Sequence, residues 1–230
     1  MNQAAVSDIS VLDAIHSLRA VREYKADPVP DEYLDRILRA GTMACSSGNT
    51  QPWEFLVLTD PKLKAQIQQW LTEEMAEVNA RRVQTPDQLV DGVGRSITGH
   101  AAVSNLVNVP AIILVFWNPE RGIRFKSEYR ELPDGTLEET VPSQDRGSSL
   151  FPACQNMMLA AKALGLGALF STFFNKLRCR DIKQLLNVPP QVFMEAAIFI
   201  GYPNEKLGPP RRRPIEELTH RNQWGIKYRD

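Results

Sequence analysis

The most informative segment of this chain reads Ser46-Ser47-Gly48-Asn49-Thr50-Gln51-Pro52-Trp53 and continues directly into Glu54-Phe55-Leu56-Val57-Leu58. It joins a segment of helical apolar spacing to a short apolar run, which predicts a helix-to-strand connection. Such a loop presents polar side chains and backbone N–H groups, and the carboxamides of Asn49 and Gln51 each offer a donor and an acceptor. The segment therefore predicts a site for a flat heterocycle, with a plain loop that anchors Trp53 in the core as the alternative.

Two clusters of arginines lie far from this segment in sequence. Arg19 and Arg22 are three residues apart, so on one turn of helix they share a face and can converge on one anion. Near the C-terminus, Arg211-Arg212-Arg213-Pro214 adds three positive charges. Solvated surface arginines are the alternative for both clusters. Taken with the loop, Arg19 and Arg22 predict contacts to an anionic ligand, and the C-terminal cluster adds positive charge.

A glycine pair, Gly165-Leu166-Gly167, separates the amphipathic segment 148–164 from the apolar run 168–173. Glycine permits a close approach of the backbone to a ligand. Backbone N–H groups, or the hydroxyls of Ser171 and Thr172, can then face a bound ring. An ordinary helix C-cap at the same glycines is the alternative, and both interpretations can hold at once.

Composition excludes several classes of protein. Lys and Arg number 27 against 27 Asp and Glu, so no overall field would draw the protein to nucleic acid or to an anionic membrane. The three cysteines are far apart and form neither a CxxC pair nor a Cys/His cluster, which argues against disulfides and against a metal site. No apolar run reaches the ~18 residues of a membrane span. We expect a soluble, cytoplasmic protein.

Periodicity predicts alternating helices and strands in one α/β or α+β domain over residues 1–230. Helices are expected near 9–18, 31–43, 61–83, 148–164 and 180–186, and strands near 55–59, 111–117, 168–173 and 193–200. Two polar excursions, near 84–99 and 118–146, contain few core-forming residues. The second carries the turn signal Pro133-Asp134-Gly135, which favours a hairpin. Both excursions are candidates for selecting a substrate.

Together these segments resemble the nitroreductase family of FMN-dependent oxidoreductases over nearly the whole chain. The family pattern Arg-Arg-Ser-x-Arg places its second and last arginines on Arg19 and Arg22, so that Leu18 and Ala20 depart from it. The family box Pro-Ser-x-x-Asn-x-Gln-Pro-Trp matches residues 46–53, with a cysteine in place of the leading proline.

The resemblance implies an α+β fold in which a central mixed β-sheet is flanked by helices. It also implies an obligate homodimer with two flavin sites at the subunit interface. A C-terminal extension, residues 209–230, would be domain-swapped over the partner, and isolated monomers would be poorly stable.

The resemblance further implies which residues bind FMN. Of Arg19 and Arg22, one would bind the phosphate and the other would stabilise the negative charge that develops near N1 and the C2 carbonyl of the reduced flavin. Arg212 is the first choice, and Arg213 the second, for a further contact to the phosphate. The choice among the three adjacent C-terminal arginines stays open. The implied cofactor-binding set is Arg19, Ala20, Arg22, Ser46, Ser47, Asn49, Gln51, Leu169, Ser171, Thr172, Arg212 and Arg213.

The expected activity is transfer of reducing equivalents from NADH or NADPH to an electron-poor small molecule, such as a nitroaromatic or a quinone, by a ping-pong mechanism. No protein residue is expected to act as a catalytic group, because flavin N5 carries the chemistry. The alternatives are a reductive dehalogenase or a flavin-fragmenting enzyme of the same fold, and a flavin-binding protein without turnover. A cofactor-free helical interaction module is disfavoured by the predicted strands.

Overall fold

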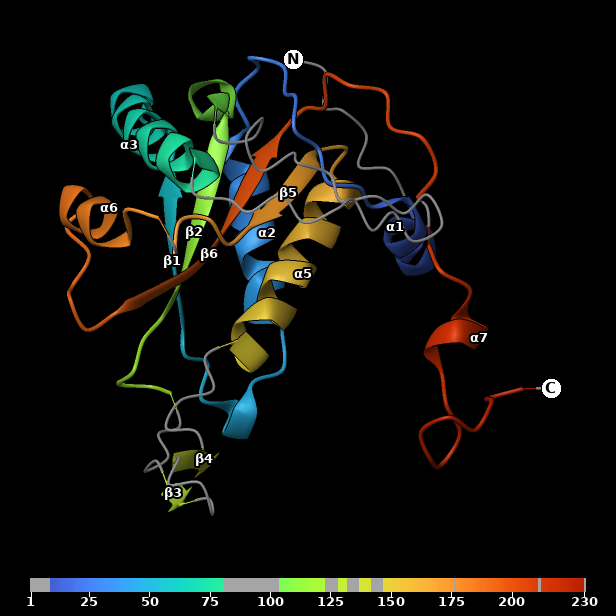
Figure 1. Ribbon diagram of the computed structural model, residues 1–230. Coiled ribbons are helices and arrows are strands. Elements are labelled where there is room, and N and C mark those ends of the chain that lie inside the picture. Colours follow the sequence, from blue (N-terminus) through green and yellow to red (C-terminus); the bar gives the residue numbers. More distant parts are fainter. Residues whose placement is uncertain are drawn as a thin grey trace.

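A four-stranded antiparallel sheet lies at the centre of the molecule (Figure 1). The computed structural model describes residues 9–80, 104–122, 128–131, 137–141, 147–175, 177–210 and 212–229. The strands are β1 (Trp53–Leu58), β2 (Ala111–Trp117), β5 (Gly167–Ser171) and β6 (Phe193–Gly201), in the order β1-β2-β6-β5. Each of these strands overlaps one that the sequence predicts.

All three pairings within this sheet are antiparallel. Among the described residues, parallel pairing is limited to an isolated bridge between Ala20 and Ala168, at the outer side of β5. The parallel component expected of a mixed sheet is therefore reduced to this one bridge. Helices and an antiparallel sheet together confirm the α+β class.

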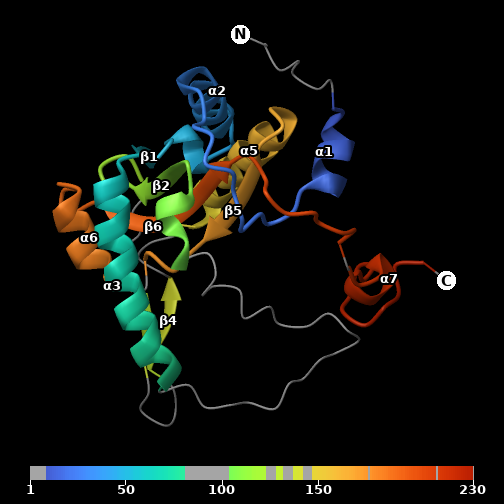
Figure 2. The same cartoon turned by 90° about the horizontal axis from the view of Figure 1, so that it is seen from above.

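Helices cover both faces of the sheet (Figure 2). On one face lie α2 (Asp31–Thr42) and α5 (Gly147–Ala163), and on the other lie α3 (Pro61–Ala80) and α6 (Cys179–Leu185). Strand β2 separates the two cores and is buried along its whole length, because its alternate side chains face opposite layers. Its continuous apolar sequence is the consequence of this double burial.

Capping residues mark several helix ends. The Asp60 carboxylate accepts from the backbone N–H groups of Lys62 (2.7 Å) and Leu63 (3.0 Å), as expected where proline occupies the first helical position of α3. These bonds to the charged form hold the pKa of Asp60 below its ordinary value. The short helix α1 (Val11–Ser17) is capped by Ser10, whose side chain accepts from Asp13 N.

The second excursion contains the hairpin that the sequence favours. Strands β3 (Glu128–Glu131) and β4 (Leu137–Val141) pair antiparallel, apart from the central sheet (Figure 1). The other excursion, 84–99, lies outside the described residues. None of the helices described is both long and apolar enough to cross a membrane.

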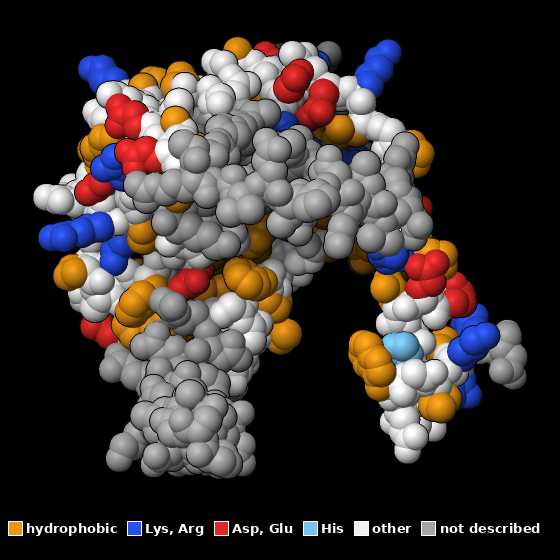
Figure 3. All heavy atoms as spheres, in the orientation of Figure 1, with side chains coloured by type: hydrophobic (Ala, Val, Ile, Leu, Met, Phe, Trp, Pro, Cys, Tyr) orange, Lys and Arg blue, Asp and Glu red, His pale blue; other side chains and the backbone are white. Residues whose placement is uncertain are grey.

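The C-terminal residues leave the body of the molecule as an arm that carries α7 (Ile215–Leu218) (Figures 1 and 3). Large apolar side chains on this arm face solvent, with exposed fractions of 61% for Ile215, 62% for Leu218, 90% for Trp224 and 54% for Ile226. Such a concentration of exposed apolar groups is characteristic of a surface that binds another protein surface.

Candidate cofactor site

A cavity of about 380 Å3 lies beyond the C-terminal end of α5, within the size range of small-molecule sites. It is formed by three segments that are distant in sequence: the end of α1, the turn from α5 into β5, and the chain after β6. Its lining residues that matter below are Ser17, Arg19, Lys162, Gly167, Glu205 and Gly208.

The turn from α5 into β5 has the features of a helix C-cap. Gly165 has φ +76°, a left-handed conformation that glycine adopts without strain, and Leu166 N donates to Ala161 O at 2.9 Å. The C-cap interpretation of this glycine therefore holds. The turn directs β5 back past the segment that contains Arg19.

The backbone of Gly167 lies very close to another part of the protein, and not to a ligand, because the residue has no side chain. A Cβ atom on Gly167 would lie 2.6 Å from Cγ2 of Val21. The neighbouring backbones are also joined, since Val21 N donates to Ala168 O at 3.0 Å. Val21 thus packs directly on the start of β5, which brings the Arg19 segment to the cavity.

The chain after β6 runs beside the same segment. One oxygen of the Glu205 carboxylate accepts from Arg22 N (2.5 Å) and Glu23 N (3.2 Å), and Lys25 N donates to Tyr202 O (2.9 Å). The buried Tyr24 hydroxyl donates to Val21 O at 2.7 Å, and burial raises its pKa well above the ordinary value. Tyr24 therefore stays neutral and acts as a tether.

Arg19 is held at the rim of the cavity by backbone carbonyls. Its Nη1 donates to His16 O (2.8 Å) and Leu18 O (2.6 Å), and its Nε donates to Gly208 O (3.2 Å). Its Nη2 group makes no hydrogen bond to any residue in the described part of the chain. The guanidinium is consequently fixed in place with donors available to an anion.

Arg22 and Ala20 take different positions from Arg19. The Arg22 side chain donates to Ala20 O at 3.0 Å and does not line the cavity. Ala20 contributes its backbone, through the bridge to Ala168. Within one chain, Arg19 is the member of this predicted group that faces the cavity.

The predicted residues of β5 also lie off the cavity. Leu169 is buried in the core beneath α3 and α6. The Ser171 hydroxyl accepts from Phe173 N at 3.3 Å and is buried, whereas Thr172 is half-buried. None of these three residues lines the cavity.

The loop 46–53 lies at the opposite end of α5. Ser47 N donates to the Ser149 hydroxyl, in the first turn of that helix, at 3.2 Å. Because α5 has 17 residues, its two ends are about 25 Å apart. A single chain therefore does not bring this loop to the cavity.

The loop itself is held in an unusual backbone conformation. Asn49 and Gln51 have φ of +54° and +48°, a region that residues other than glycine adopt at a cost. The Ser46 hydroxyl accepts from Gln51 N at 3.0 Å, and Gln51 Nε2 lies 3.3 Å from Asn49 Oδ1. Both carboxamides are exposed, so they are available to a group outside the loop.

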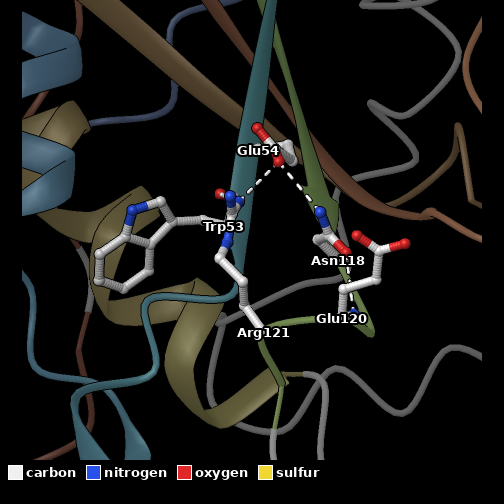
Figure 4. A network of polar contacts seen from close by, with 5 residues as sticks. All are labelled: Trp53, Glu54, Asn118, Glu120 and Arg121. Carbon is white, nitrogen blue, oxygen red and sulfur yellow. Dashed lines mark hydrogen bonds and ion pairs between the residues drawn. The ribbon is translucent and has the colours of Figure 1, made fainter.

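A polar network that the sequence did not reveal joins this loop to the excursion at 118–146 (Figure 4). Arg121 Nη2 lies 2.7 Å from Glu54 Oε1 and donates to Trp53 O at 2.7 Å, and Asn118 Nδ2 donates to the same Glu54 oxygen at 3.1 Å. Arg121 also lines a cavity of about 570 Å3 with Gln51. Only the spatial pairing of β1 with β2 reveals this connection.

The predicted C-terminal arginines lie on the exposed arm. Arg213 Nη1 is 3.6 Å from Glu217 Oε2, and neither Arg212 nor Arg213 lines the cavity of this chain. Arg211 lies outside the described residues. In contrast, Lys162 and Glu205 line the cavity although the sequence did not single them out. The one local sign for Lys162 was its position three residues before Gly165.

None of the three cysteines is among the described residues that line this cavity. Burial raises the pKa of the Cys154 thiol to about 12, so this cysteine is inert at neutral pH. Cys45, Cys154 and Cys179 are all free thiols. No set of three His, Cys, Asp or Glu side chains is placed to hold a metal ion in the ranges that the structure describes.

A family model described as the nitroreductase family matches residues 15–202. This match spans the central sheet and the helices that cover it, and it includes the part of the cavity lining between Ser17 and Ala168. The chain belongs to the nitroreductase family.

Relatives of this chain carry different names. The chain is 27% identical over 207 residues to an iodotyrosine deiodinase of Hydra vulgaris, covering 89% of this chain and 70% of that protein. It is 27% identical over 223 residues to a 5,6-dimethylbenzimidazole synthase of Rhodospirillum rubrum, covering 95% and 92%.

A solved structure shares the fold. The NADPH:FMN oxidoreductase of Vibrio harveyi, complexed with NAD+, superposes with a TM-score of 0.66 at 18% identity, covering 93% of this chain and 77% of that one. Membership of the family supports an oxidoreductase, and the different names of the relatives leave its reaction to be argued from the site.

Proposed function

We propose that this protein is an FMN-dependent oxidoreductase that passes reducing equivalents from NADH or NADPH to an electron-poor small molecule by a ping-pong mechanism. The observation that carries the proposal is the cavity beyond α5, where three segments distant in sequence place Arg19 and Lys162 around one hollow. Family membership supports it as well. Free cysteines are in keeping with a cytoplasmic location.

The residues present at the cavity fit the phosphate end of FMN. Arg19 lines the hollow with its guanidinium fixed by backbone carbonyls through Nε and Nη1, and the backbone of Gly167 lines the hollow without a side chain. The three carbonyls that hold Arg19 would keep its donors in place when an anion binds. When bound, FMN would supply hydride and electron transfer that protein side chains do not provide.

The position of the loop favours a homodimer as the functional unit. The loop that carries Asn49 and Gln51 lies at the N-terminal end of α5 and Arg19 lies near its C-terminal end, and these two helix ends are about 25 Å apart. In the proposed dimer, each flavin would lie between the cavity of one subunit and the loop of the other. Each protomer would be a single domain, and its apolar arm, residues 209–230, would cover the surface of the partner.

The test is to purify the protein, record its absorbance spectrum and mix it anaerobically with NADH or NADPH. A flavoprotein reductase is yellow, bleaches rapidly with at least one nicotinamide and regains colour with a panel of nitroaromatics and quinones. A colour that persists would indicate a flavin-binding protein without turnover. A colourless protein that FMN does not reconstitute would overturn the proposal.

Reductive dehalogenation is a second candidate, favoured by the relatives that are named iodotyrosine deiodinases. Halogenated phenols also present an electron-poor ring to a reduced flavin. Release of iodide from an iodinated tyrosine under the same anaerobic conditions, faster than reduction of any nitroaromatic, would establish this activity instead. Exchange of the excursions 84–99 and 118–146 with those of a related reductase should alter the preferred acceptor.

Substitution of the two proposed anchors tests the phosphate site. Arg19→Ala should weaken FMN binding by about 1.5 to 3 kcal/mol, because a charge-assisted contact is lost. Arg212→Ala should do the same only if the arm of one subunit reaches the cavity of the other. Equilibrium dialysis of FMN measures both, with Arg39→Ala on the outside of α2 as the control. Wild-type retention in Arg19→Ala would show that the anchor is misplaced.

A further inference from the structure

Lys162 lies in the last turn of α5 and lines the same cavity as Arg19. Its side chain is half-buried. Its ammonium has neither a hydrogen-bond acceptor nor a carboxylate partner among the residues that the structure describes. A partly buried cation without a protein partner is a natural ligand for an anion, because the anion supplies the missing contact.

The charges around the cavity show why this lysine matters. Among the residues that the structure describes, three ionisable side chains line the hollow: Arg19, Lys162 and Glu205. Glu205 is fixed there, since its carboxylate accepts from the backbone of Arg22 and Glu23. Arg19 and Glu205 alone would give a formal charge of zero, so Lys162 makes the cavity positive. A phosphate group carries up to two negative charges and requires this excess.

We propose that Lys162 binds the phosphate of the flavin and makes the cavity select FMN over unphosphorylated riboflavin. This inference rests on the proposed function. Lys162 and Arg19 approach the cavity from α5 and from the end of α1, so they contact a phosphate from two directions. The guanidinium, which backbone carbonyls hold in place, orients the group through Nη2, and the flexible ammonium neutralises its second charge.

A structural role must be separated from this one. A lysine in the last turn of a helix also interacts favourably with the terminal carbonyls. Loss of that interaction would lower the stability of the apoprotein and weaken all flavins alike. Loss of a phosphate contact would instead weaken FMN and leave riboflavin unchanged. The ratio of the two affinities therefore identifies the role.

The experiment titrates apoprotein with FMN and with riboflavin, followed by quenching of flavin fluorescence. The variants are Lys162→Met, Lys162→Gln and Lys162→Arg. The matched control is Lys206→Met, because Lys206 lies between Glu205 and Leu207, which line the cavity, without lining it itself. Thermal unfolding of each apoprotein reports whether the fold is retained.

In Lys162→Met and Lys162→Gln, the Kd for FMN should rise about 10- to 100-fold, and the Kd for riboflavin should change less than about twofold. Lys162→Arg should keep most of the preference for FMN, and Lys206→Met should match the wild type. Equal losses for both flavins, or an unchanged Kd for FMN, would overturn the inference while the proposed function stands. A wild-type protein that binds neither flavin would overturn both.

Discussion

Gly167 illustrates how one residue positions the site without contacting a ligand. Val21 packs where its side chain would begin, 2.6 Å from the ideal Cβ position. The adjacent Arg19 is held in turn by carbonyls on both sides. The absence of a side chain at one position of β5 thereby determines where a guanidinium two residues before Val21 lies.

Gly167→Ala should therefore destabilise the protein and weaken FMN binding together. The added methyl group forces Val21 away from β5, and overpacking of this kind costs about 1 to 3 kcal/mol. Urea unfolding and FMN titration measure the two effects. Gly208→Ala is the control for the urea unfolding alone, because nothing lies within 4 Å of its ideal Cβ position. Equal stability of the two variants would contradict the packing explanation.

Tyr24 predicts a specific pH dependence. Burial raises its pKa in the folded protein above the ordinary value of 10.0. Above about pH 10 the unfolded chain therefore loses this proton while the folded protein keeps it, and stability falls as the pH rises. Below pH 10 this contribution is fully present, together with the hydrogen bond to Val21 O.

Tyr24→Phe should be about 0.5 to 1.5 kcal/mol less stable than the wild type at pH 8, because the hydrogen bond is lost. Above pH 10 that difference should shrink by up to about 1.4 kcal/mol per pH unit, since the variant has no phenol to ionise. Urea unfolding from pH 8 to pH 11 measures both limbs. A difference that stays constant across this range would show that Tyr24 ionises normally in the folded state.

At the scale of the element, local sequence determined most boundaries. The run 111–117 is apolar throughout and forms β2 over the same residues, and Asp60 with its following proline marks the start of α3. These features depend on neighbouring residues, which a single sequence displays. The antiparallel pairings depend instead on which strands meet, and periodicity carries no information about that.

The site was predicted in part for the same reason. Arg19 was singled out because arginine spacing is a local pattern, and it lines the candidate cavity, while its role in binding FMN stays a prediction. Lys162 and Glu205 were missed because each becomes significant only when α5, the turn after it and the segment after β6 meet. Leu169 was placed in the predicted set, yet its side chain packs into the core.

The loop 46–53 gives a prediction that separates strain from function. A glycine at this position removes the cost of the left-handed conformation, which is about 1 to 2 kcal/mol. It also makes the unfolded chain more flexible, which lowers the stability of the folded protein by about 0.5 to 1 kcal/mol. The free energy of unfolding of Gln51→Gly should therefore lie within about 1 kcal/mol of the wild-type value, whereas its affinity for FMN should be lower. Gln69→Ala, which removes an exposed carboxamide from α3, is the control. Wild-type FMN affinity in Gln51→Gly would exclude that carboxamide from the site.

At the scale of the whole molecule, one chain by itself neither brings the loop to the cavity nor buries the apolar side chains of the arm. The loop and the cavity lie at opposite ends of α5, and the arm exposes Ile215, Leu218 and Ile226. A second copy, arranged symmetrically, would satisfy both at once, because each subunit can offer its loop and receive the other's arm. The protein should then have no stable folded monomer at low concentration.

Removal of residues 210–230 should convert a dimer into a smaller, less stable species that does not retain FMN. Light scattering coupled to size-exclusion chromatography measures the mass across a dilution series. A gentler variant, Leu218→Ser with Ile226→Ser, should weaken assembly, whereas Glu216→Ser on the same helix should not. An unchanged dimer after truncation would show that the arm is not part of the interface.

The 90% exposure of Trp224 gives the molecule an internal reporter. Two of the other three tryptophans, Trp53 and Trp117, are buried, and Trp70 is half-buried. Indole emission moves to shorter wavelength as water is excluded, so any event that covers the arm changes chiefly the light from this one ring. Intrinsic tryptophan fluorescence can therefore report when the arm docks, without an added dye.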